Sequence, residues 1–84
     1  MATEQEFESA VERSKNLAER PSNNVLLQLY GLFKQASEGD VNTERPGGFD
    51  FKNIAKWDAW KQLQGKSREE ARAEYVQLVT KLAE

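Results

Sequence analysis

The feature that most constrains this chain is a helix-length segment that is apolar on too many sides for a surface helix. Six of the eight positions from 26 to 33 are apolar, within a segment predicted to be helical over residues 23–37. A surface helix of a globular protein buries a single apolar stripe. This segment therefore either lies at the centre of a helical bundle or presents a second face to a ligand or partner. Gly31 lowers its helix propensity by about 1 kcal/mol relative to alanine, but it also leaves room for a close neighbour.

Three further segments show helical periodicity, and cap or stop signals separate all four. The pattern predicts helices over residues 4–18, 51–64 and 68–83 in addition to 23–37. The predicted caps are Thr3, Ser22, Asp50 and a capping box from Ser67 to Glu70, and the predicted stops are Pro21, Gly39 and Gly65. The sequence thus predicts an all-α, single-domain four-helix bundle spanning residues 1–84.

The lengths of the connections predict how these helices are arranged. About four residues separate the first two helices, so we expect them to pack as an antiparallel pair. The loop over residues 39–49 is long for a small helical domain, and it allows the third helix to run parallel to the second. Such a loop is either a solvated crossover or a functional segment, and its composition alone favours neither.

Composition excludes several classes of function. The chain of 84 residues contains no cysteine and no histidine, which removes disulfides, thiolate metal sites and the usual general base. A net charge of −2 gives no overall attraction to nucleic acid. The acidic start does not resemble a signal peptide, and no apolar run approaches the ~18 residues of a membrane span. We therefore expect a cytoplasmic protein that binds no metal or nucleic acid, does not insert stably into membranes and is not an enzyme.

Positive residues beside aromatic ones are the best candidates for a binding site. Lys34 follows Phe33 and lies one helical turn beyond Tyr30, while Lys52 and Lys56 lie four residues apart on the third predicted helix. Such lysines often only keep a surface soluble. Rings beside them favour a nucleotide site instead, because bases stack on rings and phosphates bind ammonium groups.

The order of short motifs along the chain resembles the acyl-CoA-binding protein family, also called diazepam-binding inhibitor. The likeness runs from Phe7 to Leu82 at uniform spacing, and its pieces are specific when taken together. They are Leu29-Tyr30, Lys34-Gln35-Ala36, Gly39-Asp40, Asn42, Arg45-Pro46-Gly47, Ala55-Lys56-Trp57-Asp58-Ala59-Trp60, Gly65-Lys66-Ser67, Glu70-Ala71 and Tyr75-Val76.

The resemblance implies a fold, a function and a set of ligand contacts. The implied fold is an up-down-down-up four-helix bundle with a long crossover loop between helices 2 and 3. The implied function is an intracellular, monomeric carrier that binds medium- to long-chain fatty acyl-CoA thioesters one to one. It holds the CoA 3′-phosphate and adenine, shields the acyl chain, and uses no cofactor. The implied ligand contacts are Ala10, Lys15, Leu26, Tyr30, Phe33, Lys34, Lys56 and Tyr75.

A protein-interaction module remains the alternative. A bundle with a wide apolar second helix can also hold an amphipathic partner helix in a groove. The cluster of lysine and tyrosine residues distinguishes the two hypotheses, because a hydrophobic groove does not need it.

Overall fold

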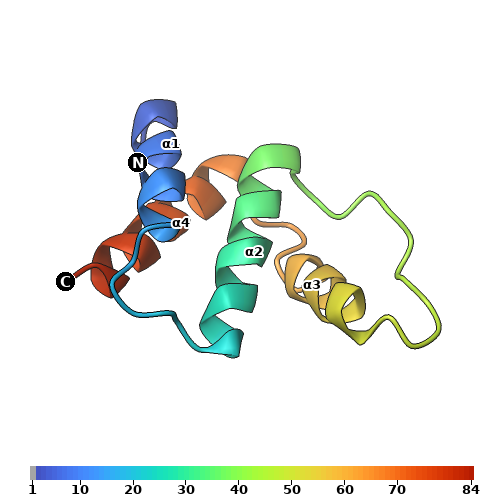
Figure 1. Cartoon of the computed structure of the whole chain (residues 1–84). Helices are drawn as coiled ribbons and strands as arrows, with labels where there is room; N and C mark the ends of the chain where they lie inside the picture. Colours follow the sequence, from blue (N-terminus) through green and yellow to red (C-terminus); the bar gives the residue numbers. More distant parts are fainter. Residues whose placement is uncertain (1) are drawn as a thin grey trace.

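The protein is built from four helices and a long loop (Figure 1). The computed structural model describes residues 2–84, over which it contains no strand. The helices are α1 (Glu4–Ser14), α2 (Asn23–Glu38), α3 (Phe51–Lys61) and α4 (Arg68–Leu82). The predicted all-α, four-helix fold with a long crossover between its second and third helices is confirmed.

Local capping explains where the helices begin. The Thr3 hydroxyl accepts from the Glu6 N–H and the Glu6 carboxylate accepts from the Thr3 N–H, which makes a complete capping box. Ser22 and Ser67 each accept a backbone N–H three residues on, as predicted. The predicted capping box at Ser67 is only half formed, because the Glu70 carboxylate accepts from the Ser67 hydroxyl and not from its backbone N–H. Asp50 also occupies a cap position, but its carboxylate accepts from the side chain of Asn53 at 2.8 Å rather than from a backbone N–H. The predicted side-chain cap at Asp50 is therefore wrong.

Three helices end earlier than predicted, α4 by only one residue. α1 stops at Ser14 and not at residue 18, because side chains compete for the carbonyls of its last turn. The Ser14 hydroxyl donates to the Val11 carbonyl at 2.7 Å, and the Asn16 amide donates to the Glu12 carbonyl at 3.0 Å. α3 stops at Lys61 and not at residue 64, since the chain continues in tighter three-residue turns up to Gly65, whose φ is 94°.

α2 is the central helix, packed against both α3 and α4, whereas α1 packs against α4. The expected antiparallel pairing of α1 with α2 is wrong. The reason is an aromatic cluster: the Phe7 ring meets the edge of Tyr75 at 5.2 Å, and the Tyr75 hydroxyl donates to Ser14 at 3.1 Å. α1 and α2 meet through side chains, with the Phe7 and Phe33 rings 6.1 Å apart.

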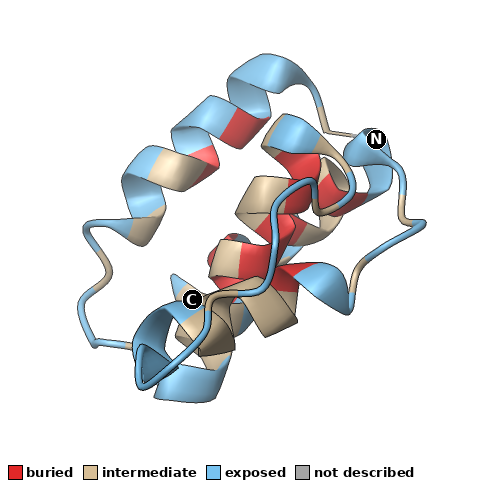
Figure 2. Cartoon of the chain, turned by 90° about the vertical axis from the view of Figure 1, so that its right-hand side faces the viewer, coloured by how far each residue is buried: buried red, intermediate tan, exposed pale blue. Residues whose placement is uncertain are grey.

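The core lies where the helices face one another, and most of the crossover loop is exposed (Figure 2). The buried apolar residues are Phe7, Ala10, Leu29, Leu32, Ala36, Trp60, Ala71, Tyr75 and Val79. They come from all four helices and account for the helical periodicity of the sequence. The core therefore explains one apolar face of α2 and leaves Tyr30 and Phe33 only half-buried.

A buried glutamine holds the end of α2 to the turn between α3 and α4. Gln35 is 0% exposed, and its amide nitrogen donates to the Asp40 carboxylate and the Lys66 carbonyl, both at 2.8 Å. The Gly65 N–H also donates to Asp40 at 2.8 Å. These two hydrogen bonds, from Gly65 and then from Gln35, lower the pKa of Asp40. The arrangement fixes the place where the crossover loop leaves α2.

Candidate functional site

The candidate site depends on a very close approach of α2 to α3. A Cβ atom added to Gly31 would lie 2.8 Å from the carbonyl oxygen of Ala59 and 3.3 Å from the Leu63 side chain. A side chain at position 31 would therefore push the two backbones apart. The close neighbour suggested by Gly31 in the sequence is the backbone of α3.

Where the two helices approach, a lysine on each helix lies over an aromatic ring of the other helix. The Lys34 ammonium group on α2 lies 4.8 Å from the ring centre of Trp60 on α3. The Lys56 ammonium group on α3 lies 5.4 Å from the ring centre of Tyr30 on α2. Each cation thus rests on an aromatic face supplied by the other helix, which is a favourable electrostatic contact. The two helices together hold a pair of positive charges beside two rings.

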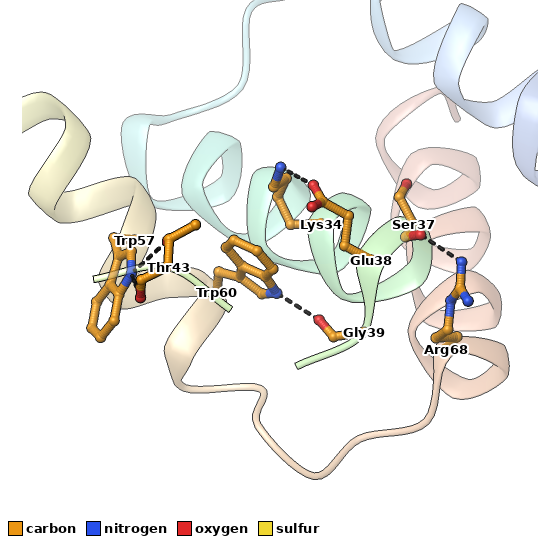
Figure 3. Close-up of polar contacts among 8 residues, drawn as sticks. All are labelled: Lys34, Ser37, Glu38, Gly39, Thr43, Trp57, Trp60 and Arg68. Carbon is orange, nitrogen blue, oxygen red and sulfur yellow. Dashed lines mark hydrogen bonds and ion pairs between the residues drawn. The ribbon is translucent and has the colours of Figure 1, made fainter. Parts of the chain in front are cut away.

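Lys34 also has an anionic neighbour on its own helix (Figure 3). Its ammonium group forms a hydrogen-bonded ion pair with Glu38, one turn further along α2. The hydrogen bond with Lys34 lowers the pKa of Glu38. Any anionic ligand that binds Lys34 must therefore compete with this carboxylate.

Three contacts fix the crossover loop against α3. The indole N–H of Trp57 donates to the carbonyl of Thr43 at 3.0 Å, and that of Trp60 donates to the carbonyl of Gly39 at 2.8 Å (Figure 3). Arg45 forms a two-point ion pair with Asp58, with N···O distances of 2.9 and 3.0 Å, and this hydrogen bonding lowers the pKa of Asp58. The loop is therefore exposed but held in place, which favours its interpretation as part of a site.

The crossover loop, α2 and α3 line a hollow of about 260 Å³ around the two lysines. It is smaller than the ~300–1,000 Å³ that drug-sized ligands occupy, so it suits one part of a large ligand. The hollow is lined by Tyr30, Lys34, Thr43, Glu44, Pro46, Asn53, Lys56, Trp57 and Trp60.

A larger groove of about 860 Å³ lies between α2, α3 and α4. Its charged lining residues are Asp58, Glu74 and Lys81, a net charge of −1, and leucine, alanine and neutral amide side chains supply most of the rest. The charged lining of the smaller hollow, Lys34, Lys56 and Glu44, has a net charge of +1. The smaller hollow is therefore the better site for an anion, in spite of its size.

The structure brings three of the eight predicted contact residues into this hollow, namely Tyr30, Lys34 and Lys56. Phe33 and Tyr75 lie next to each other in the aromatic cluster, with ring centres 6.4 Å apart. Ala10 and Tyr75 are core residues, 1% and 4% exposed. Lys15 is exposed directly after α1, and Leu26 is half-buried against the core one turn before Tyr30. Ligand contact stays a prediction at all eight positions, including the three that line the hollow.

Several lining residues were not among the predicted contacts. Glu38 does not line the hollow, but its pairing with Lys34 could have been found from its spacing, because a lysine and a glutamate four residues apart on a helix are neighbours. Burial was predicted for at least one tryptophan, and Trp60 is 3% exposed. The contact of the Trp60 ring with the Lys34 ammonium group depends on how α2 and α3 cross. Thr43 and Pro46 join the site through the path of the loop, which no local pattern specifies.

The described residues 2–84 offer neither a metal site nor a membrane span. No group of three or more acidic side chains there is placed to hold a metal ion. Over the same residues, no helix is both long enough and apolar enough to cross a membrane.

Comparison with known proteins gives consistent matches over the whole chain. The family model described as "Acyl CoA binding protein" matches residues 4–79. "Acyl-CoA-binding domain-containing protein 1" of Oryza sativa subsp. japonica is 51% identical over 84 residues, which is 100% of this chain and 92% of that protein. "Acyl-CoA-binding protein" of Gossypium hirsutum is 50% identical over 84 residues, 100% of this chain and 94% of that protein. The crystal structure of Oryza sativa Acyl-CoA-Binding Protein 2 aligns with a TM-score of 0.89 at 51% identity, covering 93% of this chain and 87% of that one.

Proposed function

Because the chain belongs to the acyl-CoA-binding protein family, we propose that it binds fatty acyl-CoA thioesters one to one as a carrier. The crossed arrangement of lysines and rings between α2 and α3 supports this proposal most directly. It combines two cations for phosphate with aromatic faces beside them, which is the chemistry that a nucleotide head group requires.

The CoA head binds at the hollow. Lys34 and Lys56 bind the 3′-phosphate in the hollow, and the Tyr30 hydroxyl adds a hydrogen bond. The adenine packs against the ring of Phe33, which directly precedes Lys34 on α2 and lies outside the hollow. A charge-assisted hydrogen bond contributes about 1.5–3 kcal/mol, so the two lysines together account for a substantial part of the affinity. The hollow holds only this part of the ligand, and the remainder lies along the surface of the helices.

The acyl chain follows the half-buried side of α2 that begins at Leu26, one turn before Tyr30. Each methylene removed from water contributes about 0.8 kcal/mol, or about fourfold in affinity. Medium and long chains should therefore bind progressively tighter until the apolar surface is covered. The thioester is shielded and not cleaved, so the role is that of an intracellular buffer and not of an enzyme.

Calorimetric titration with acyl-CoA esters from octanoyl to stearoyl, kept below micelle formation, tests the proposal. We expect one-to-one binding that tightens with chain length, weak binding of CoA alone and very weak binding of palmitate. Equal affinities for palmitate and palmitoyl-CoA would refute the role of the head group.

Variants separate the lysines of the hollow from lysines in general. Lys34→Ala and Lys56→Ala should each weaken binding about 10- to 100-fold, because each removes one charge-assisted contact. Lys61→Ala is the matched control, since Lys61 is exposed on α3 and does not line the hollow. An equal loss in all three variants would show that only the overall charge matters.

The larger groove supports the second candidate function, a module that binds an amphipathic partner helix. Stoichiometric recovery of a protein partner, together with no heat from any ester, would favour this function. Ester binding that depends on Lys34 and Lys56 would exclude it as the main role of the hollow.

A further inference from the structure

Two large aromatic residues stand in solvent beside the candidate site. Phe49 is 89% exposed and Phe51 is 68% exposed, and they are the two large exposed hydrophobic residues in the described part of the chain. Their rings lie edge to face, with centres 6.1 Å apart. The Phe51 N–H donates to the Phe49 carbonyl at 2.9 Å, in a tight turn that places both rings together. Exposed apolar groups that the core does not need point to an interaction surface.

The pair lies where the crossover loop enters α3. Figure 1 shows this loop reaching away from the helices, on the side of the molecule opposite the two chain ends in that view. Asn53 and Lys56, which follow on α3, line the hollow. The aromatic pair therefore borders the ligand site at an outlying part of the fold.

The charge near the pair differs from that of the whole protein. Residues 41–56 carry three basic and two acidic side chains, a net charge of +1 in a chain with a net charge of −2, and one of the three, Arg45, is paired with Asp58 just outside this range. Lys52, directly after Phe51, is exposed. The intervening Asp50 carboxylate is engaged by the Asn53 amide at 2.8 Å. An approaching surface thus meets two rings, the Lys52 ammonium group and the Asp50 carboxylate, whose charge the neutral Asn53 amide does not cancel.

The size of the pair favours a lipid surface over a folded protein. An aromatic side chain buries about 150–250 Å², so two rings cover at most about 500 Å². A stable protein interface usually buries about 800 Å² on each partner and needs a complementary shape. A bilayer accepts projecting phenylalanine rings at the boundary between head groups and acyl chains, and its anionic lipids attract lysine.

We propose that Phe49, Phe51 and Lys52 dock this protein reversibly on an anionic lipid bilayer. The two rings enter the interface, and the Lys52 ammonium group pairs with lipid phosphate. This goes beyond the proposed carrier function, because docking does not require a bound ligand. It also places the hollow next to the surface where an amphiphile with an acyl chain partitions.

Cosedimentation with sucrose-loaded vesicles tests docking without any acyl-CoA. Vesicles of phosphatidylcholine alone are compared with vesicles that also contain phosphatidylglycerol. The unaltered protein should bind the anionic vesicles several-fold more tightly than the neutral ones. No binding to anionic vesicles, or equal binding to both, would overturn the proposal.

Two pairs of variants assign the surface. The double change Phe49→Ser and Phe51→Ser should weaken vesicle binding at least tenfold, while changing both residues to leucine should keep it within about threefold. Lys52→Glu should weaken it about tenfold, whereas Lys61→Glu, the same charge change at the other end of α3, should stay within about threefold. Unchanged binding by the serine variant, or equal losses in the two glutamate variants, would overturn the assignment.

Circular dichroism and acyl-CoA titration without vesicles complete the experiment. Retained helical signal shows that the variants are folded. Ester binding by a protein that does not bind vesicles refutes docking alone, and vesicle binding by a protein that binds no ester refutes the carrier function alone.

Discussion

Replacing Gly31 by alanine tests the structural basis of the candidate site, because two effects of opposite sign compete there. Within a helix, alanine is more favourable than glycine by about 1 kcal/mol. From the sequence of α2 alone, Gly31→Ala should therefore stabilise the protein. Position 31 faces the α3 backbone, however, and the new Cβ atom would lie 2.8 Å from the Ala59 carbonyl oxygen.

The geometry decides which effect is larger. Carbon atoms in contact prefer separations of about 3.5–4.0 Å, so α2 and α3 must move apart by roughly 0.5–1 Å. Overpacking of this kind typically costs about 1–3 kcal/mol, and backbone atoms yield less easily than a side-chain tip. After the propensity gain, we expect a net destabilisation of about 1 kcal/mol. For a domain of this size, that corresponds to a Tm lower by about 4–8 °C.

The same movement should affect the ligand site. Lys34 and Lys56 lie on opposite sides of the contact at Gly31, so separating α2 from α3 changes the spacing of the two cations. We expect acyl-CoA affinity to fall about tenfold, since part of one charge-assisted contact is lost.

Thermal unfolding and calorimetric titration measure the two consequences. Gly47→Ala is the matched control, because a Cβ atom at Gly47 would meet no described atom within 4 Å. Its stability and affinity should stay close to those of the unaltered protein. A Tm that rises in Gly31→Ala, with unchanged affinity, would refute the idea that close helix approach builds the site.

Three further outcomes follow from the contacts around the hollow. Glu38→Gln should tighten acyl-CoA binding by up to about fivefold in titrations, because Lys34 no longer pairs with a competing carboxylate; weaker binding would show that Glu38 helps to hold the ligand. Asp40 has a lowered pKa in the fold, so its contribution to stability is present above its unfolded-state pKa of about 3.9 and is lost as pH falls through the folded value. In acid unfolding followed by circular dichroism, Asp40→Asn should therefore lose less stability between neutral and low pH, and an unaltered acid transition would contradict this. Trp60→Phe should lower the free energy of unfolding in urea by about 1–3 kcal/mol, since the Gly39 carbonyl loses its buried donor, and a value near zero would show that water replaces the bond.

Much of the helical framework could be predicted because its determinants are local. The capping box at Thr3, the serine caps and the positive φ of Gly39 and Gly65 act within one or two turns of the chain. Helix ends were less predictable where polar side chains compete for carbonyls. The Ser14 hydroxyl bonds back to its own helix and contributes to ending α1 early, which apolar periodicity does not register.

The site was only partly encoded in local patterns. The resemblance to a known family indicated that Lys34, Lys56 and Tyr30 act together, and the structure places all three at one hollow. The resemblance did not indicate that Lys34 lies over the Trp60 ring and Lys56 over the Tyr30 ring. That pairing depends on the crossing of α2 and α3, which Gly31 permits through a contact with a residue 28 positions away in the sequence.

By itself, then, the sequence determined four helices, most of their caps and the residue types of the candidate site, because these follow from the side chains and their immediate neighbours. Only the tertiary structure decided that α1 packs on α4, that the crossover loop is held by Trp57 and Trp60, and that Lys34 lies over the ring of Trp60. These features depend on contacts between residues distant in sequence, where steric fit and hydrogen-bond geometry select one arrangement among several with the same local preferences.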